Sequence, residues 1–140
     1  MTTVFGRAVP TWLRLIRIYQ KADRHLISHL REHDISLAQF DVLAQISGHS
    51  GLSQQDLADR LLVTKGNVCQ LVERMSDADL ISRRPDGRAN RLHLTAHGQE
   101  VLDHLLPAQN EEIDRIFSVL TPEELAQLNG LLRKVERSLT

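Results

Sequence analysis

The sequence predicts a mainly α-helical fold with one small β-hairpin, and three observations lead to this fold class. Apolar residues recur every three or four positions over most of the chain, which is the spacing of amphipathic helices. Between residues 80 and 95 the spacing changes to alternation around a Pro-Asp-Gly turn, which indicates two paired strands. A length of 140 residues and a hydrophobic fraction of 41% suit one domain with its own core.

The composition also bears on where the protein works. The N-terminal region has no signal-peptide pattern, because basic residues and a proline interrupt every apolar run there. No segment is long and apolar enough to span a bilayer. A single cysteine excludes an internal disulfide and is typical of a reducing compartment. We therefore expect a cytoplasmic protein without a membrane partner.

The first helix is predicted over residues 12–30 by an amphipathic stripe. Its apolar positions are Trp12, Leu15, Ile16, Tyr19, Ala22, Leu26, Ile27 and Leu30. Residues 34–36 break the pattern. Ser36 and Gln39 then have the spacing of a capping box, which begins a second helix that runs to about Ser47. Residues 48–51 form a turn.

Two further helices follow the turn. Ser53 and Asp56 form a capping pair for a short helix that ends near Leu61. Thr64 can cap the next helix, which extends to about Asp79. The buried face of that helix is set by Val68, Leu71, Val72 and Met75.

A hairpin and two long helices complete the chain. Leu80-Ile81 begins one strand, residues 85–87 form the turn, and Leu92 and Leu94 alternate with polar residues in the other strand. Thr95 can cap a helix to about residue 120, and Pro107 should kink or locally break it. Thr121, with proline next and glutamate three residues later, begins a last helix that extends to Leu139.

A short helix, a turn, a second helix and a basic hairpin form a winged helix-turn-helix, whose principal use is binding DNA. We place this part at residues 35–97 and dimerisation helices at 8–33 and 98–140. The reason is that the long terminal helices carry apolar stripes that the small module does not need for its own core. The alternative is that these helices simply pack against the module.

The charge distribution fits this assignment, although the net charge is only −1. Residues 60–99 carry seven basic and four acidic side chains, whereas residues 100–140 carry four basic and eight acidic ones. Positive charge is therefore concentrated where a polyanion would bind.

The helix after Thr64 has a polar face that suits base recognition. Gln70 and Asn67 can bond adenine edges and Arg74 can reach guanine or phosphate, whereas Glu73 and Asp77 would repel phosphates. The N-terminal half should therefore face the groove. We also expect phosphate contacts in this region. Ser53 would make one at the start of the short helix, and Thr64, Lys65 and the open backbone at Gly66 would make others at the start of the second helix. An ordinary solvated helix face is the alternative.

The hairpin is the wing. Four arginines lie within nine residues with one opposing aspartate, and they are Arg83, Arg84, Arg88 and Arg91. Arginine is drawn to the concentrated negative potential of the minor groove, and Arg88 near the tip is the best candidate for insertion. Asp86 should orient a neighbouring arginine or close the turn. Of the four, Arg84, Arg88 and Arg91 are our predicted DNA contacts.

These residues carry a family resemblance over nearly the whole chain. The runs SLAQFDVLAQI, LSQQDLADRLLVTKGNVCQLVERM and LISRRPDGRANRLHLTAHGQE resemble the MarR family of bacterial transcription regulators. The family's wing pattern falls on Asp86, Arg88, Leu94 and Thr95, and Gly98 matches the glycine of the next helix. The wing is about two residues shorter than in typical members, and Ser82 stands where many of them have glutamate.

The resemblance implies a triangular homodimer with interlocked terminal helices that binds double-stranded DNA. It implies a repressor of nearby genes that recognises a palindromic operator and is released by a small molecule, often aromatic and anionic. The alternative function is a protein-interaction or architectural module with only non-specific affinity for DNA. The sequence contains no paired-carboxylate, glycine-rich or nucleophile motif, so we expect no enzymatic activity and no cofactor.

Three kinds of signal are weighed. Trp12, Arg17 and Tyr19 are candidates for an effector pocket, although Trp12 and Tyr19 fit a core or dimer interface better. Cys69 lies close to a helix N-terminus and is a candidate redox site, with inert packing favoured. His25, His29 and His33 recur every four residues, so His25 and His29 are weak metal candidates; plain surface histidines are favoured, and no metal is assigned.

Overall fold

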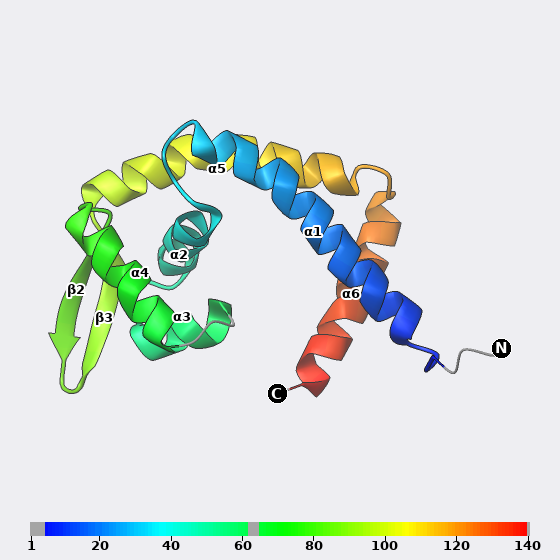
Figure 1. Cartoon of the computed structure of the whole chain (residues 1–140), viewed down its shortest axis with the longest axis horizontal. Coiled ribbons are helices and arrows are strands. Elements are labelled where there is room, and N and C mark those ends of the chain that lie inside the picture. The colour runs from blue at the N-terminus through cyan, green and yellow to red at the C-terminus, as the bar shows by residue number, and fades with distance from the viewer. Residues whose placement is uncertain (1–4, 62–64, 140) are drawn as a thin grey trace.

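The computed structural model describes residues 5–61 and 65–139, and it confirms a mainly helical fold with a small antiparallel sheet. Figure 1 shows helix α5 running along one edge of the molecule, with a compact unit at one end and two outlying helices at the other. The helices are α1 (Val9–Arg31), α2 (Leu37–Gly48), α3 (Gln54–Leu61), α4 (Lys65–Asp77), α5 (Ala96–Phe117) and α6 (Pro122–Ser138). The strands are β1 (Leu52–Ser53), β2 (Ile81–Asp86) and β3 (Ala89–Leu94).

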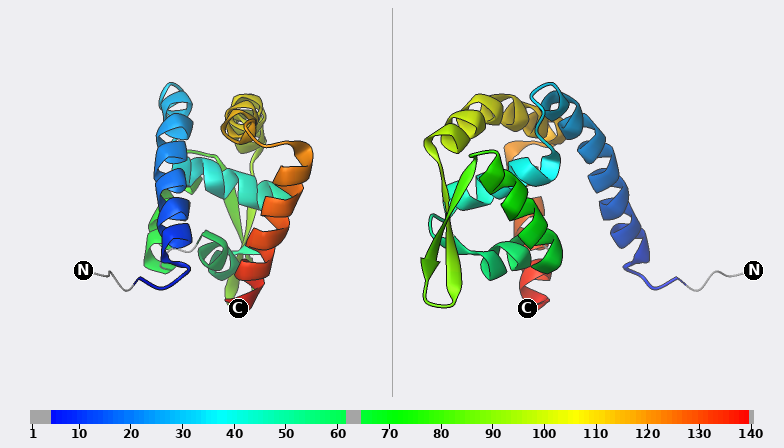
Figure 2. Two further views of the ribbon diagram at one scale, coloured as in Figure 1. Left: turned by 90° about the vertical axis from the view of Figure 1, so that its right-hand side faces the viewer. Right: turned by 60° about the vertical axis from the view of Figure 1, so that its left-hand side comes forward.

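We call α2, α3, α4 and the three strands the head, and α1 and α6 the two arms. The turned view in Figure 2 (left) places α1 and α6 on opposite sides, with α2 between them. Within the part of the chain that the structure describes, no helix is long and apolar enough to cross a membrane.

The predicted helix caps on described residues are confirmed, whereas the predicted cap at Thr64 lies outside the described residues. Ser36 and Gln39 form a reciprocal capping box at the start of α2, with N···O distances of 3.1 and 3.0 Å. Thr121 and Glu124 do the same for α6. Each box satisfies two backbone N–H groups that the first helical turn leaves without partners. Local sequence therefore determines where these helices begin.

Several helix boundaries differ by one to three residues from the sequence prediction, and α5 for example ends at Phe117 rather than near residue 120. Helix α1 begins at Val9 rather than Trp12, with Pro10 in its first turn, where a missing N–H is tolerated. Helix α4 ends at Asp77 rather than Asp79, because Asp79 has a left-handed φ of 59° that terminates the helix.

Of the two outcomes predicted at Pro107, a kink or a local break of α5, the break is wrong. The helix continues from Ala96 to Phe117 with the proline inside it. Buried residues anchor the helix on both sides of the proline, namely Leu102 and Leu105 before it and Gln109 after it. Proline itself is exposed, so packing of the opposite face holds the two halves together.

The sheet has the order β1-β3-β2, and β1 is a strand that the sequence prediction missed. It is only two residues long, with Leu52 paired to Leu92, so it offers no alternation to detect. The pairing of β2 with β3 also places the hairpin turn farther along the chain than predicted. Strand β2 continues through Pro85 to Asp86, and the turn consists of Gly87 and Arg88 instead of residues 85–87. Gly87 has a φ of 63°, which suits a two-residue hairpin turn.

The core lies between the sheet, α2, α3, α4 and the first half of α5. Its fully buried side chains come from all of these elements, and they include Val42, Leu43, Ile46, Leu57, Val68, Val72, Met75, Ile81, Leu92, Leu102 and Leu105. The arms contribute little, since Leu30 is the buried residue of α1 and α6 has none among its described residues.

A close backbone approach fixes the wing to α5. A Cβ atom built on Gly98 would lie 1.9 Å from the carbonyl oxygen of Leu80 and 2.9 Å from its carbonyl carbon. The Thr95 N–H donates to the same carbonyl at 3.2 Å, and the Thr95 hydroxyl donates to the Asp79 carbonyl while accepting the Gly98 N–H. Only glycine fits at position 98 without moving the strand.

Candidate nucleic-acid interface

Helix α4 presents the polar face that its sequence predicted. Val68, Val72 and Met75 are fully buried and Leu71 is half-buried, which confirms the inner face. The opposite side is exposed, and its described members are Gly66, Asn67, Gln70, Glu73, Arg74 and Asp77. The helix therefore offers amide groups in its first half and carboxylates in its second.

Gly66 stands in the exposed first turn, and nothing in the described part of the chain requires a glycine there. A Cβ atom at this position would meet no atom within 4 Å, and the backbone is not in the left-handed region. The absence of a side chain leaves the backbone open to a ligand outside the chain. Thr64 lies outside the described residues, and of Lys65 only the backbone is described, as the first residue of α4.

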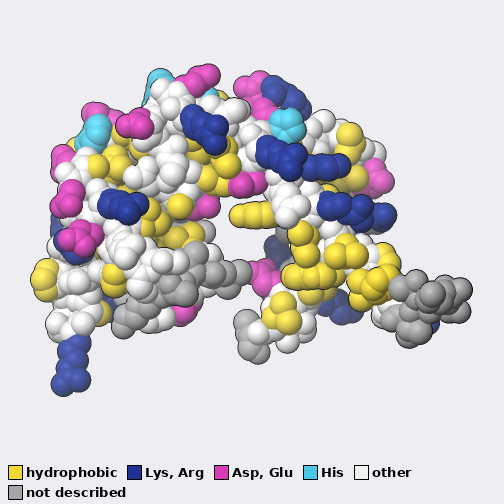
Figure 3. Space-filling model, viewed as in Figure 1, with side chains coloured by type: hydrophobic (Ala, Val, Ile, Leu, Met, Phe, Trp, Pro, Cys, Tyr) yellow, Lys and Arg dark blue, Asp and Glu magenta, His cyan; other side chains and the backbone are white. Residues whose placement is uncertain are grey.

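The wing carries exposed basic side chains towards its tip. Arg83 and Arg84 lie on β2 and Arg88 lies in the turn, and all three are exposed. The space-filling view in Figure 3 shows a basic side chain that projects beyond the rest of the molecule at the end of the hairpin. This is the position that a side chain needs to reach into a groove.

Arg91 is held differently from the other wing arginines. Its Nε donates to the Asp86 carboxylate at 3.3 Å, and its Nη1 donates to the Gly51 carbonyl at 3.4 Å. Arg84 lies directly opposite Arg91 across the ladder, so Asp86 offsets the repulsion between two like charges. The prediction that Asp86 orients a neighbouring arginine is confirmed, and the half-buried Arg91 braces the hairpin against the turn before β1.

Polar contacts connect the wing to α4. The Asn90 side-chain amide donates to Gln54 Oε1 at 3.3 Å, and the Gln54 amide donates to Cys69 Sγ at 3.5 Å. A cleft of about 330 Å³ lies between α4 and the wing, with Cys69 on one side and Arg88 on the other. Gln54 and Asn90 were not predicted from the sequence, because only the strand register brings them together.

Ser53 lines the same cleft, but its hydroxyl accepts the Asp56 N–H at 3.0 Å and so caps α3. The predicted contact of Ser53 with DNA must therefore share the hydroxyl with the cap. Cys69 is exposed, so its thiol is not packed into the core.

The effector candidates on α1 separate into two groups. Trp12 and Tyr19 are 62% and 69% exposed, so their assignment to the core of the chain is wrong and an interface remains. Tyr19 lines a cavity of about 520 Å³ between α1, α2 and α4, together with Gln70 and Arg74 of α4. Trp12 and Arg17 do not line this cavity; the Arg17 Nε donates to the Leu13 carbonyl at 3.4 Å.

The same cavity contains two carboxylates, Asp23 and Asp41. Asp41 is exposed over part of its surface, yet desolvation raises the pKa of its carboxyl above the usual value, and the nearby charge of Asp23 raises it further. The cavity therefore combines acidic groups with one arginine and one phenol.

The histidines predicted as weak metal candidates are also divided by the fold. His29 and His33 lie close together with Glu32 at the end of α1, and the His33 ring meets His104 of α5. His25 does not belong to this group.

A helix-turn-helix with an exposed polar second helix and an arginine-bearing wing defines a winged helix-turn-helix transcription regulator that binds DNA. A model of the MarR family matches residues 33–92. A relative from Bacillus cereus, an uncharacterized HTH-type transcriptional regulator, is 34% identical over 127 residues that cover 90% of this chain and 86% of the relative. The chain belongs to the MarR family.

Solved structures agree with this assignment. A mutant of MarR from E. coli complexed with operator DNA superposes with a TM-score of 0.83 at 26% identity, covering 96% of this chain and 99% of that one. The S. aureus MepR–DNA complex has a TM-score of 0.75 at 27% identity, with coverages of 97% and 99%. AbsC from Streptomyces coelicolor, at 22% identity and a TM-score of 0.86 over 99% of this chain and 98% of AbsC, shares the fold.

Proposed function

We propose that the chain is a homodimeric repressor that binds a palindromic operator and releases it when a small molecule binds. The observation that carries the proposal is that α4 and Arg88 of the wing border the same cleft. A recognition helix in the major groove and a wing in the adjacent minor groove need these two elements on one side of the head.

The reading roles follow from exposure and chemistry. Gln70 and Asn67 are assigned to base edges, because their amides match adenine. We assign Ser53, Thr64, Lys65 and the backbone at Gly66 to contacts with the phosphate backbone. Arg74 is assigned to phosphate or to guanine. Arg88 and Arg84 are assigned to the minor groove, and Arg91 supports them from the base of the wing. The MarR and MepR structures with DNA support this use of the fold.

Exposed apolar side chains on both arms support a homodimer. Figure 3 shows hydrophobic side chains gathered over the part of the molecule that α1 and α6 form. On α6 and its C-cap they occupy one face, with exposures of 40% to 81%, and are Leu125, Leu131, Leu132, Val135 and Leu139. A second copy would bury these faces, and its two-fold symmetry would match a palindrome.

The cavity beside Tyr19 is the proposed effector site. Arg74 can attract an anionic group, and the carboxylates of Asp23 and Asp41 can accept hydrogen bonds from a phenol. A molecule bound there would touch Gln70 and Arg74, which are also assigned to DNA. Effector and operator would therefore compete for the same side chains, and each would weaken the binding of the other.

The test uses duplexes from the region upstream of the chain's own gene and fluorescence anisotropy over a range of salt concentrations. Gln70→Ala should change the preference among single-base variants of the duplex. Arg88→Ala should weaken binding to all of them alike and reduce the salt slope by about 1. Arg115→Ala on α5, where the arginine pairs with Glu111 and Glu112, is the control and should leave binding unchanged.

Two outcomes would reject the assignment. Binding unchanged in both Gln70→Ala and Arg88→Ala would mean that DNA does not contact this face. A wild-type chain that binds all duplexes equally, without a two-fold footprint at moderate salt, would be the architectural module rather than a specific repressor.

A further inference from the structure

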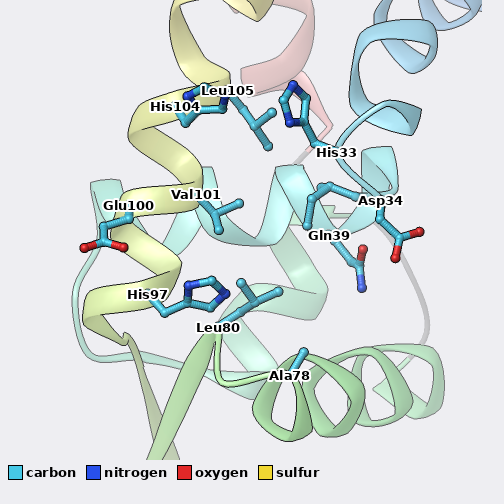
Figure 4. A pocket seen from close by; sticks show the side chains of 11 residues that line it. His33, Asp34, Gln39, Ala78, Leu80, His97, Glu100, Val101, His104 and Leu105 are labelled. Atoms are coloured by element: carbon cyan, nitrogen blue, oxygen red, sulfur yellow. The ribbon is translucent and has the colours of Figure 1, made fainter.

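A histidine cluster lies where the end of α1 meets the middle of α5, away from the α4–wing cleft. His29, Glu32 and His33 each have a ligand atom within 4.8 Å of those of the other two. His104 approaches from α5 and its ring meets the His33 ring edge-on, while its ring nitrogens lie outside the group of three. Figure 4 shows His33 and His104 facing each other at one end of a cavity of about 530 Å³, with His97 and Glu100 farther along α5.

The ring separations match those of imidazoles that share one tetrahedral metal ion. With a Zn–N bond of about 2.0–2.1 Å, the centroid of a bound imidazole lies about 3.2 Å from the metal. Two such rings at the tetrahedral angle have centroids about 5.2 Å apart. The centroids of His29 and His33 are 5.2 Å apart, and those of His33 and His104 are 4.9 Å apart.

A further observation fits a metal ligand at this place. The His29 Nε2 atom is buried, and within the described residues it has no hydrogen-bond partner, which is costly for a polar atom. Glu32 is exposed beside it, so its carboxylate can turn towards an ion. The cluster thus contains an imidazole nitrogen that no described residue satisfies, next to an accessible carboxylate.

We propose that His29, Glu32, His33 and His104 bind one Zn²⁺ ion between α1 and α5. Three neutral imidazoles and one carboxylate suit zinc and other borderline transition metals, whereas Mg²⁺ and Ca²⁺ prefer sets made only of oxygen ligands. His33, His104 and Glu32 are exposed, so their side chains are free to turn towards the ion. His25, which the sequence also indicated as a weak metal candidate, lies one helical turn before His29 and serves as an internal comparison.

The site would connect an arm to the helix that carries the wing. Helix α5 follows β3 directly through Thr95, and the end of α1 leads into α2. An ion held by residues of both helices would fix α1 relative to α5, and with it the distance between the two heads of a dimer. This consequence rests on the proposed function, whereas the binding of zinc does not.

The experiment measures Zn²⁺ binding to the full chain without a polyhistidine tag, in competition with a chromophoric chelator. We expect one ion per chain, a rise in melting temperature with zinc, and a tetrahedral visible spectrum when Co²⁺ replaces it. His33→Gln and His104→Gln should each lower the zinc affinity by at least about 100-fold. The control variants His25→Gln and His49→Gln should bind zinc like the wild type, and circular dichroism checks that every variant is folded.

Three results would overturn the proposal. The first is wild-type zinc binding weaker than about 10 µM with no fixed stoichiometry, which is ordinary binding by surface histidines. The second is an unchanged zinc affinity in His33→Gln and His104→Gln. The third is a loss of zinc affinity in His25→Gln equal to that in the two cluster variants. Anisotropy with DNA, with and without zinc, separates this proposal from the proposed function. Zinc binding without specific DNA binding would leave the metal site standing, and specific DNA binding without zinc binding would remove the metal site alone.

Discussion

The head and the two arms have similar apolar patterns in sequence, but the apolar side chains are buried in the head and exposed on the arms. In the head, every predicted inner-face residue of α4 is buried or half-buried, and the sheet, α2, α3 and α5 supply the partners. In the arms, side chains of equal hydrophobicity remain exposed, such as Tyr19 at 69% and Val135 at 58%. The head satisfies its own pattern, whereas the arms do not.

The difference shows what an amphipathic pattern specifies. Periodicity identifies the side of a helix that avoids water, but it does not identify the surface that covers that side. Soluble monomers rarely expose large contiguous apolar patches, so the unsatisfied faces of α1 and α6 favour a partner chain. Tight internal packing in the head and open faces on the arms lead to three predictions of decreasing size.

The largest effect is expected at Gly98, where α5 packs against the head and no extra atom is tolerated. Gly98→Ala should lower the free energy of unfolding by about 2–4 kcal/mol, because its Cβ would collide with the Leu80 backbone. The matched change in an arm is Gly130→Ala, where a Cβ meets no atom within 4 Å. It should be neutral or stabilise by about 0.5–1 kcal/mol, since alanine favours a helix. Urea denaturation measures both, and equal effects would erase the contrast between head and arms.

The next effect tests whether the arms are covered by a second copy. Leu131→Glu combined with Val135→Glu should raise the dimer dissociation constant at least about tenfold, because two charges would enter an apolar interface. Sedimentation equilibrium measures this constant. Ala126→Glu adds a charge on the opposite side of α6, at 100° per residue, and should leave it unchanged. A double variant that stays dimeric would place the interface elsewhere.

The smallest effect concerns the boundary between head and arm, at Asp41. An acid whose pKa is raised by folding binds its proton more readily in the folded chain, so stability falls as pH rises from 3.8 through the folded pKa. The ionised carboxyl then costs stability at neutral pH. Asp41→Asn should stabilise at pH 7 by at most about 0.5 kcal/mol, and the difference should vanish below pH 3.8.

Thermal unfolding from pH 3 to pH 8 follows the Asp41 effect. Asp114→Asn, which removes an exposed carboxyl on α5, is measured in parallel as the control variant. A destabilising Asp41→Asn at pH 7 would mean that the ionised carboxyl has a favourable partner in solution, for example across the dimer.

Much of the site was predictable because it is local. The caps at Ser36, Thr95 and Thr121 and the exposed face of α4 depend on residues three or four positions apart. The pairing of Asp86 with Arg91 was predictable in kind, since the two lie on one hairpin. The hydrogen bonds from Asn90 to Gln54 and from Gln54 to Cys69 were not predictable, because they join residues up to 36 positions apart.

The sequence by itself determined the helices, the wing and the class of protein, because caps, periodicity and turn residues act over a few positions. Tertiary structure alone decided that Pro107 does not break α5, that the hairpin turn lies at Gly87-Arg88, and that His104 joins His29 and His33. Each of these depends on contacts between elements distant in sequence. Such contacts override a local preference whenever packing on both sides of a residue holds the backbone in place.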